Sequence, residues 1–243
     1  MALNEVKGSI APTGKLRVAI NFGNVVLAQR DPVTSEPKGV SVDLARIVSD
    51  RLDLPVEFNY FDSAGKVFDA VAQAKIDVCF LAIDPLRATE IAFTPPYVNI
   101  EGTYIVRQGS SYHSVQDLDA NGVRIAVGGG AAYDLFLSRA LKSATLVRST
   151  TSASAIAAFA EQQLDAAAGV RQPLQTFSQS HAGFRVLSDS FTTIHQAMGV
   201  PTGRGAAHLY LTEFIEEMKR TGFVRKSLDD SGQTDAAVAS AAT

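Results

Sequence analysis

The chain has 243 residues, of which 46% are hydrophobic and 19% charged, and its formal net charge is −3 at pH 7. These proportions are ordinary for a globular protein, and the length allows one large domain or two small ones. With no excess of positive charge, the composition gives no support to a nucleic acid or an anionic membrane as the partner and favours a small molecule.

The single cysteine, Cys79, excludes an internal disulfide and any metal cluster built on cysteines. It lies in the apolar run from Val78 to Ile83, which predicts a buried structural thiol rather than a nucleophile. The histidines are scattered without metal-ligand spacing, so we expect neither a metal nor a cofactor. No apolar window approaches the ~20 residues of a membrane span.

Short runs rich in Val and Ile alternate with segments of helical period, a pattern typical of an α/β fold with mostly parallel strands. For the first part of the chain we predict strands at 16–20, 56–60, 76–83 and 102–107, and helices at 40–52 and 65–75. The first of these helices is marked by apolar residues spaced regularly from Val40 to Leu52, and Pro55 follows its end.

The second part repeats the scheme, which predicts strands at 123–127, 144–147, 164–170, 184–187 and 193–200 and helices at 131–142, 152–162 and 206–221. Two segments, Ile76–Leu86 and Leu164–Leu174, align without gaps and favour duplication of one plan. We therefore predict two similar α/β lobes, with helices on both faces of each sheet. Residues 229–243 have little apolar bulk and are predicted to be a disordered tail.

Arg87 follows the carboxyl end of a predicted buried strand, which is where ligands bind in open α/β sheets. Its guanidinium is a planar cation suited to a carboxylate or a phosphate. From position alone, an exposed arginine paired with Glu90 is an equally good interpretation.

The stretch Gly128-Gly-Gly-Ala-Ala-Tyr-Asp134 follows a strand and begins a helix, so its backbone N–H groups could hold an anion. It matches neither the dinucleotide fingerprint nor a P-loop, and a turn that needs glycine for its backbone angles is the alternative. Asp84 and Asp134 could form an acid and base pair, although a capping or turn role is simpler for each.

A series of short motifs runs in order through the chain. It includes Leu16-Arg-Val-Ala-Ile, Gly39-Val-Ser-Val-Asp, Pro85-Leu-Arg, Ile91-Ala-Phe-Thr and Val123-Arg-Ile-Ala-Val. Together these motifs resemble the family 3 solute-binding proteins of polar amino acid ABC transporters, over nearly the whole chain. The resemblance implies a two-lobed, periplasmic binding protein-like fold of type II, with two hinge strands and a ligand held in the cleft between the lobes.

Carried over by position, the resemblance implies a first lobe of residues 1–104 plus 195–228 and a second lobe of residues 105–194. It assigns the carboxylate-binding role to Arg87 and a backbone contact to Ala82. The full set of expected ligand-binding residues is Arg87, Ala82, Asn21, Phe22, Asn24, Gly130, Ala131, Ala132, Arg171 and Asp84.

One position departs from the family pattern. The aspartate expected to hold a ligand's α-ammonium group falls on Val170. A buried ammonium without that carboxylate loses a charge-assisted bond worth roughly 1.5–3 kcal/mol. Arg171 would instead offer a second cation and favour a dianion or a ligand other than an amino acid, although neighbours on a strand face opposite sides unless a bulge or turn intervenes.

The leading hypothesis is a non-enzymatic, monomeric binding protein that closes its lobes on a small carboxylate and delivers it to an ABC transporter permease. An enzyme similar to cyclohexadienyl dehydratase and a ligand-sensing domain are the alternatives. The resemblance implies a periplasmic protein, yet the N-terminal stretch lacks the apolar core of a secretory signal. If Met1 is the native start, a cytoplasmic location is expected.

Overall fold

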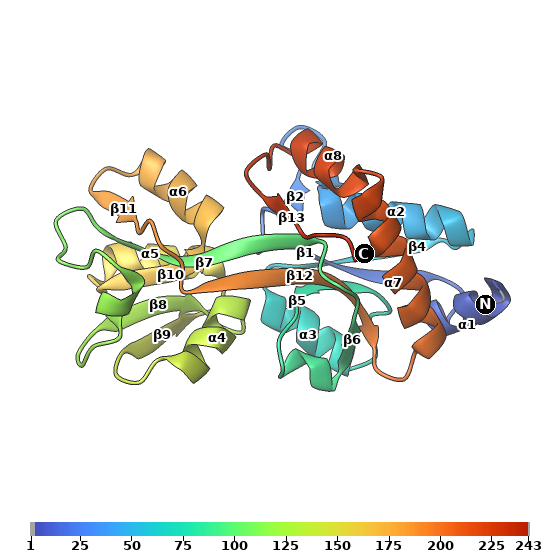
Figure 1. Ribbon diagram of the computed structural model, residues 1–243, viewed down its shortest axis with the longest axis horizontal. Helices are drawn as coiled ribbons and strands as arrows, with labels where there is room; N and C mark the ends of the chain where they lie inside the picture. Colours follow the sequence, from blue (N-terminus) through green and yellow to red (C-terminus); the bar gives the residue numbers. More distant parts are fainter. Residues whose placement is uncertain (1–2, 243) are drawn as a thin grey trace. The chain divides into compact units, whose positions relative to one another are not determined.

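In the computed structural model, which describes residues 3–242, the chain divides into two compact units. The first contains the residues up to Asn99 and those from His195 onward, and the second contains Ile100–Ile194. The chain passes between them inside two long strands, β7 (Val98–Arg107) and β12 (Thr192–Pro201) (Figure 1). The first boundary therefore falls after residue 99 rather than after residue 104, and the second falls after residue 194.

Parallel strands in the first unit bring three carboxyl ends to one edge. Strand β1 (Leu16–Asn21) pairs in parallel with β4 (Val56–Phe61). A parallel bridge from Val18 to Val78 links β1 to the chain that enters β5 (Cys79–Ala82). The loops after β1, β4 and β5 consequently leave the sheet at the same edge, where open α/β sheets bind their ligands.

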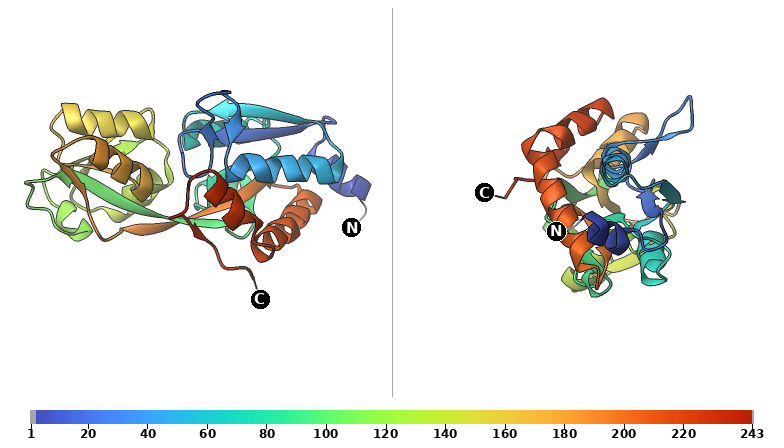
Figure 2. Two further views of the ribbon diagram at one scale, coloured as in Figure 1. Left: turned by 90° about the horizontal axis from the view of Figure 1, so that it is seen from above. Right: turned by 90° about the vertical axis from the view of Figure 1, so that its right-hand side faces the viewer.

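Helices and short strands complete the first unit, and both α1 and the last described residues belong to it (Figure 2). They are α1 (Leu3–Ile10), β2 (Gln29–Arg30), β3 (Pro37–Lys38), α2 (Val40–Leu52), α3 (Ala64–Ala72), a 3₁₀ turn (Arg87–Thr89), β6 (Ile91–Phe93), α7 (Gly205–Arg220), α8 (Phe223–Asp230) and β13 (Ala237–Val238). Helix α2 buries the apolar face predicted for it and ends at Asp53, which has a left-handed conformation.

The second unit is a mixed sheet with helices packed on it. Strand β7 pairs antiparallel with β10 (Ala166–Val170), and β10 pairs in parallel with β8 (Arg124–Gly128). The remaining elements are a 3₁₀ turn (Val115–Leu118), α4 (Ala132–Ala140), β9 (Thr145–Ser149), α5 (Ser152–Glu161), α6 (Arg171–Ser180) and β11 (Phe184–Val186). Its core includes Ile105, Phe159 and Leu174.

Helix α6 was not expected from the sequence. Its ten residues are mostly polar, and only Leu174 among them is buried, so the helical period of apolar residues is missing. Pro173 does not interrupt the helix because it lies in the first turn, where its missing N–H group would have had no intrahelical partner.

The structure also differs from the predicted disordered tail. Helix α8 continues to Asp230, and β13 pairs antiparallel with the start of β7, with Ala237 opposite Asn99. Arg225 donates hydrogen bonds to the carbonyls of Gln233 and Ala236. Backbone pairing with β7 and the hydrogen bonds from Arg225 thus order this segment, although it has few large apolar side chains. Thr243 lies outside the described residues.

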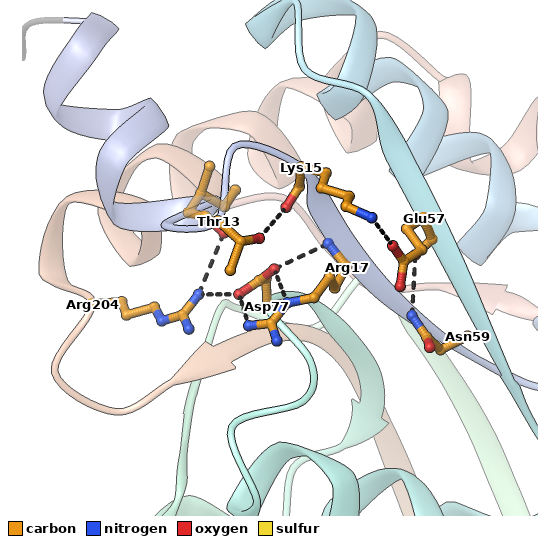
Figure 3. Close-up of polar contacts among 8 residues, drawn as sticks. Thr13, Lys15, Arg17, Glu57, Asn59, Asp77 and Arg204 are labelled. Atoms are coloured by element: carbon orange, nitrogen blue, oxygen red, sulfur yellow. Dashed lines mark hydrogen bonds and ion pairs between the residues drawn. The ribbon is translucent and has the colours of Figure 1, made fainter.

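Asp77 connects three segments of the first unit (Figure 3). Its side chain is fully buried and accepts hydrogen bonds from Arg17 Nε at 2.8 Å and from Arg204 Nη1 at 2.7 Å. Arg204 also donates to the carbonyl of Ile10 at the end of α1. Burial alone would raise the pKa of Asp77, but the hydrogen bonds from Arg17 and Arg204 outweigh burial and hold the pKa below 3.8.

We expect Asp77→Asn to lower the free energy of unfolding by about 3 kcal/mol at pH 7, because it removes the charge that compensates two partly buried arginines. Since the pKa of Asp77 is lowered in the folded protein, its contribution is complete above pH ~4 and is lost as the pH falls further. Urea unfolding of the wild type and of Asp77→Asn should show a smaller difference in the free energy of unfolding at pH 3 than at pH 7.

Asp50→Asn is the matched control, because Asp50 is exposed on α2, and we expect it to change the unfolding free energy by less than about 0.5 kcal/mol. An equal loss for Asp77→Asn at both pH values would contradict the assigned role of its charge.

Candidate functional site

Arg87 lies in the 3₁₀ turn that follows β5, and its side chain is only 1% exposed. Its Nη1 donates a hydrogen bond to the carbonyl of Ala82, the last residue of β5, at 3.1 Å. Burial lowers the pKa of Arg87 to about 10, although the charge of Asp84 acts in the opposite direction. The guanidinium is therefore a buried, positioned cation at neutral pH, and an exposed arginine at this position is excluded.

Asp84 shapes the turn that carries Arg87. Its Oδ1 accepts a hydrogen bond from the N–H of Leu86 at 2.9 Å, and its carbonyl accepts one from Ala88 at 2.9 Å. The side chain is buried. These contacts are those of a turn-forming aspartate, and its negative charge also lies close enough to raise the pKa of Arg87.

Asn21 and Asn24 form the turn that follows β1. Asn21 Oδ1 accepts from the N–H of Gly23 at 2.9 Å, and Asn24 Oδ1 accepts from the N–H of Val26 at 3.3 Å. A side chain at Gly23 would place its Cβ 2.3 Å from the carbonyl oxygen of Asp62, so only glycine fits there. The turn after β1 is therefore packed tightly against the chain that leaves β4.

Phe22 has a different environment from its two neighbours. Its ring stacks on that of Tyr60, with centroids 5.3 Å apart and planes 23° apart. A pocket of about 360 Å³ in the first unit is lined by Phe22, Arg30, Tyr60, Phe61, Asp62 and Lys66. Of these six residues only Phe22 was expected from the sequence, although the position of Tyr60 and Phe61 at the carboxyl end of β4 was a usable signal.

In the second unit, Gly130, Ala131 and Ala132 lead into α4, as the sequence predicts. The N–H of Gly130 donates to Asp134 Oδ2 at 2.9 Å, and the N–H of Ala131 donates to the carbonyl of Gly128 at 3.1 Å. Ala132 is the first residue of the helix, where an N–H group has no intrahelical partner. Of the three amides expected to hold an anion, that of Ala132 is thus the best placed.

Asp134 is a capping and ion-pairing residue. Besides the bond from Gly130, its carboxylate accepts hydrogen bonds from Arg148 Nε at 3.0 Å and from Ser138 Oγ at 3.3 Å. Its side chain is buried, whereas that of Arg148 is half exposed. This carboxylate stabilises the start of α4, which fits the simpler of the two roles considered for it.

Arg171 has contacts that differ from those predicted. Val170 ends β10 and Arg171 begins α6, so a change from strand to helix separates the two side chains. The Arg171 guanidinium donates to the Glu101 carboxylate and to three carbonyl groups. Those carbonyls belong to Leu187, Ser188 and Asp189. These bonds lie within the second unit and hold the segment before β12, so they do not support a second cation for a ligand.

Residues 3–242 contain neither a candidate metal site nor a membrane-spanning helix. Among them, no group of three or more His, Cys, Asp or Glu side chains is arranged to hold a metal ion. No helix in the same range is both long and apolar enough to cross a bilayer. Cys79 is fully buried, as predicted, and burial raises the pKa of its thiol to about 12.

Residues 17–230 match the family described as bacterial extracellular solute-binding proteins, family 3. The chain belongs to this family. No curated protein sequence matches it significantly. The family match covers both units and includes Arg87 and the start of α4.

Solved structures with a similar fold include amino acid-binding proteins of low sequence identity. A mutant of ArgBP from T. maritima superposes with a TM-score of 0.79 at 20% identity, covering 96% of this chain and 99% of that chain. AbpA from Streptococcus pneumoniae, bound to L-arginine, superposes with a TM-score of 0.79 at 20% identity, covering 93% of this chain and 98% of that chain. The cysteine-binding protein from Campylobacter jejuni superposes with a TM-score of 0.78 at 18% identity, covering 94% of this chain and 92% of that chain. The protein has the two-lobed, periplasmic binding protein-like fold.

We expect Arg171→Met to lower the free energy of unfolding by about 2 kcal/mol, because it removes charge-assisted hydrogen bonds to the segment 187–189. Hydrogen exchange should become faster in that segment. Arg124→Met is the control, since Arg124 is exposed in the same unit and its guanidinium makes one long hydrogen bond, 3.4 Å to the carbonyl of Gln163. Unchanged exchange at 187–189 would show that Arg171 has some other role.

Proposed function

We propose that this protein binds a small solute bearing a carboxylate group, without chemical turnover, and presents it to an ABC transporter permease. The observation that carries the proposal is Arg87, a buried guanidinium at the carboxyl end of β5 in a chain of the family 3 solute-binding proteins. A planar guanidinium can make two parallel hydrogen bonds to one carboxylate.

Burial makes the charge of Arg87 costly. Desolvation lowers the pKa of Arg87, and the negative charge of Asp84 acts in the opposite direction. A ligand carboxylate beside the guanidinium would offset it further. Hydrogen bonds that Asp84 accepts from the N–H groups of Leu86 and Ala88 fix the backbone turn that carries the arginine, so little conformational entropy would be lost on binding.

The start of α4 in the second unit is the other element that we assign to the ligand. Its first N–H groups point out of the helix, and the helix dipole favours an anion there. The match to the family, which includes this helix, supports the assignment. Because Gly130 and Ala131 have hydrogen-bonded amides, we give the main donor role to Ala132.

The ligand that we propose need not carry an α-ammonium group. Val170 ends β10 without a carboxylate, at the position that the family resemblance assigns to ammonium binding. AbpA binds L-arginine, and a putative binding component of an ABC transporter from Wolinella succinogenes is complexed with lysine. For this chain we propose an amino acid-like or other organic acid, recognised first through its carboxylate.

The contacts of the two acid candidates favour binding over catalysis. Asp84 forms a turn, and Asp134 caps α4 and pairs with Arg148. Family membership also supports a periplasmic location and a permease as partner, and we include both in the proposal.

The test begins with native mass spectrometry of the purified protein to find a solute that has copurified with it. Thermal unfolding is then measured with that solute, or with a panel of carboxylates, and with the corresponding primary amides. A ligand at 100 times its dissociation constant should stabilise the protein by about 2.7 kcal/mol. We expect carboxylates to raise the melting temperature of the wild type and their amides to have no effect.

Arg87→Met should remain folded by circular dichroism, because a side chain of similar length fills the buried site, but it should show no ligand-induced rise. Arg46→Met, at an exposed arginine on α2, should respond like the wild type. An Arg87→Met protein that is stabilised as strongly as the wild type would refute the assignment.

A further inference from the structure

The pocket around Phe22 lies at the same edge of the first unit's sheet as the loop that leads to Arg87. It is built where β1 and β4 end, and the N–H of Phe22 donates to the carbonyl of Phe61 at 2.8 Å. Strand β1 is linked on one side to β4 and on the other to the chain entering β5. The pocket and the loop that leads to Arg87 are thus on adjacent strand ends of the same unit.

Two stacked aromatic rings and the guanidinium of Arg30 form one part of the pocket wall. The guanidinium carbon of Arg30 lies 4.4 Å from the centroid of the Phe22 ring and 5.1 Å from that of the Tyr60 ring. The negative faces of these stacked rings attract the cation. Arg30 comes from the short strand β2, so three separate segments place this charge.

The charges of the pocket do not cancel. Lys66 pairs with Asp62 at 2.8 Å, which uses the one carboxylate that lines the pocket. Arg30 forms no ion pair with any carboxylate in residues 3–242. The guanidinium of Arg30 is exposed. The faces of the two rings do not neutralise its charge, and its N–H groups remain available as hydrogen-bond donors. The pocket thus presents a net positive charge on an aromatic surface.

We infer that the pocket binds the distal end of the solute and that Arg30 selects a second anionic group there. The solute class is then a dicarboxylate or an acidic amino acid. A solute with a cationic side chain, such as the L-arginine bound by AbpA, would be repelled by Arg30. This inference rests on the proposed function, because it needs a carboxylate at Arg87 to set the position of the distal group.

Isothermal titration calorimetry with six probes separates the possibilities. Glutarate and L-glutamate carry a distal carboxylate, butyrate and L-glutamine carry a neutral end, and L-arginine and L-lysine carry a distal cation. We expect the wild type to bind glutarate or L-glutamate at least about tenfold more tightly than the neutral counterpart, as a charge-assisted bond predicts. Comparing glutarate with L-glutamate shows whether an α-ammonium group is tolerated.

Variants at Arg30 test its role directly. Arg30→Gln should reduce the preference for the distal carboxylate by about tenfold, and Arg30→Glu should invert it in favour of L-arginine or L-lysine. Arg46→Gln and Arg46→Glu are the matched controls, since Arg46 is an exposed arginine of the same unit that does not line this pocket. They should preserve the wild-type order of affinities.

Three results would overturn the inference. One is a wild type that binds L-arginine or L-lysine more tightly than L-glutamate, and another is an order of affinities that Arg30→Gln leaves unchanged. The third is a wild type that binds butyrate as tightly as glutarate. If Arg87→Met then abolished the binding of butyrate, the proposed function would stand although the inference about Arg30 had failed. Failure of every carboxylate probe to bind would count against the proposed function as well.

Discussion

The cost of burying the positive charge of Arg87 governs the proposed function of this protein. A guanidinium that is 1% exposed needs negative charge and hydrogen-bond acceptors around it. The chain supplies the carbonyl of Ala82 and the nearby charge of Asp84, and both are fixed by the turn that follows β5. A guanidinium fixed in this way at the end of a strand is suited to a solute carboxylate, which is the ligand group that we propose.

Much of the fold could be predicted from the sequence, because its main elements carry strong periodic patterns. The buried runs of β1, β5 and β8 and the apolar face of α2 coincide with predicted elements. Helix α6 and strand β13 could not be found in this way. The first has almost no apolar face, and the second is held by backbone pairing with β7, which depends on residues more than a hundred positions away.

Sequence patterns could indicate a candidate residue that depends on its position along one strand, but not a group of residues brought together from several segments. Arg87 could be recognised from a single rule about strand ends. Arg30 could not, because its importance depends on rings contributed by β4 and by the turn after β1. Arg171 was given a ligand role from its neighbour Val170, but the start of α6 turns its side chain toward Glu101 and the segment before β12.

The most direct test of the central claim is a crystal structure of the protein with its copurified solute bound. We expect a carboxylate of the solute with both oxygens about 3 Å from the guanidinium nitrogens of Arg87. A bound solute that places no anionic group against Arg87 would contradict the account.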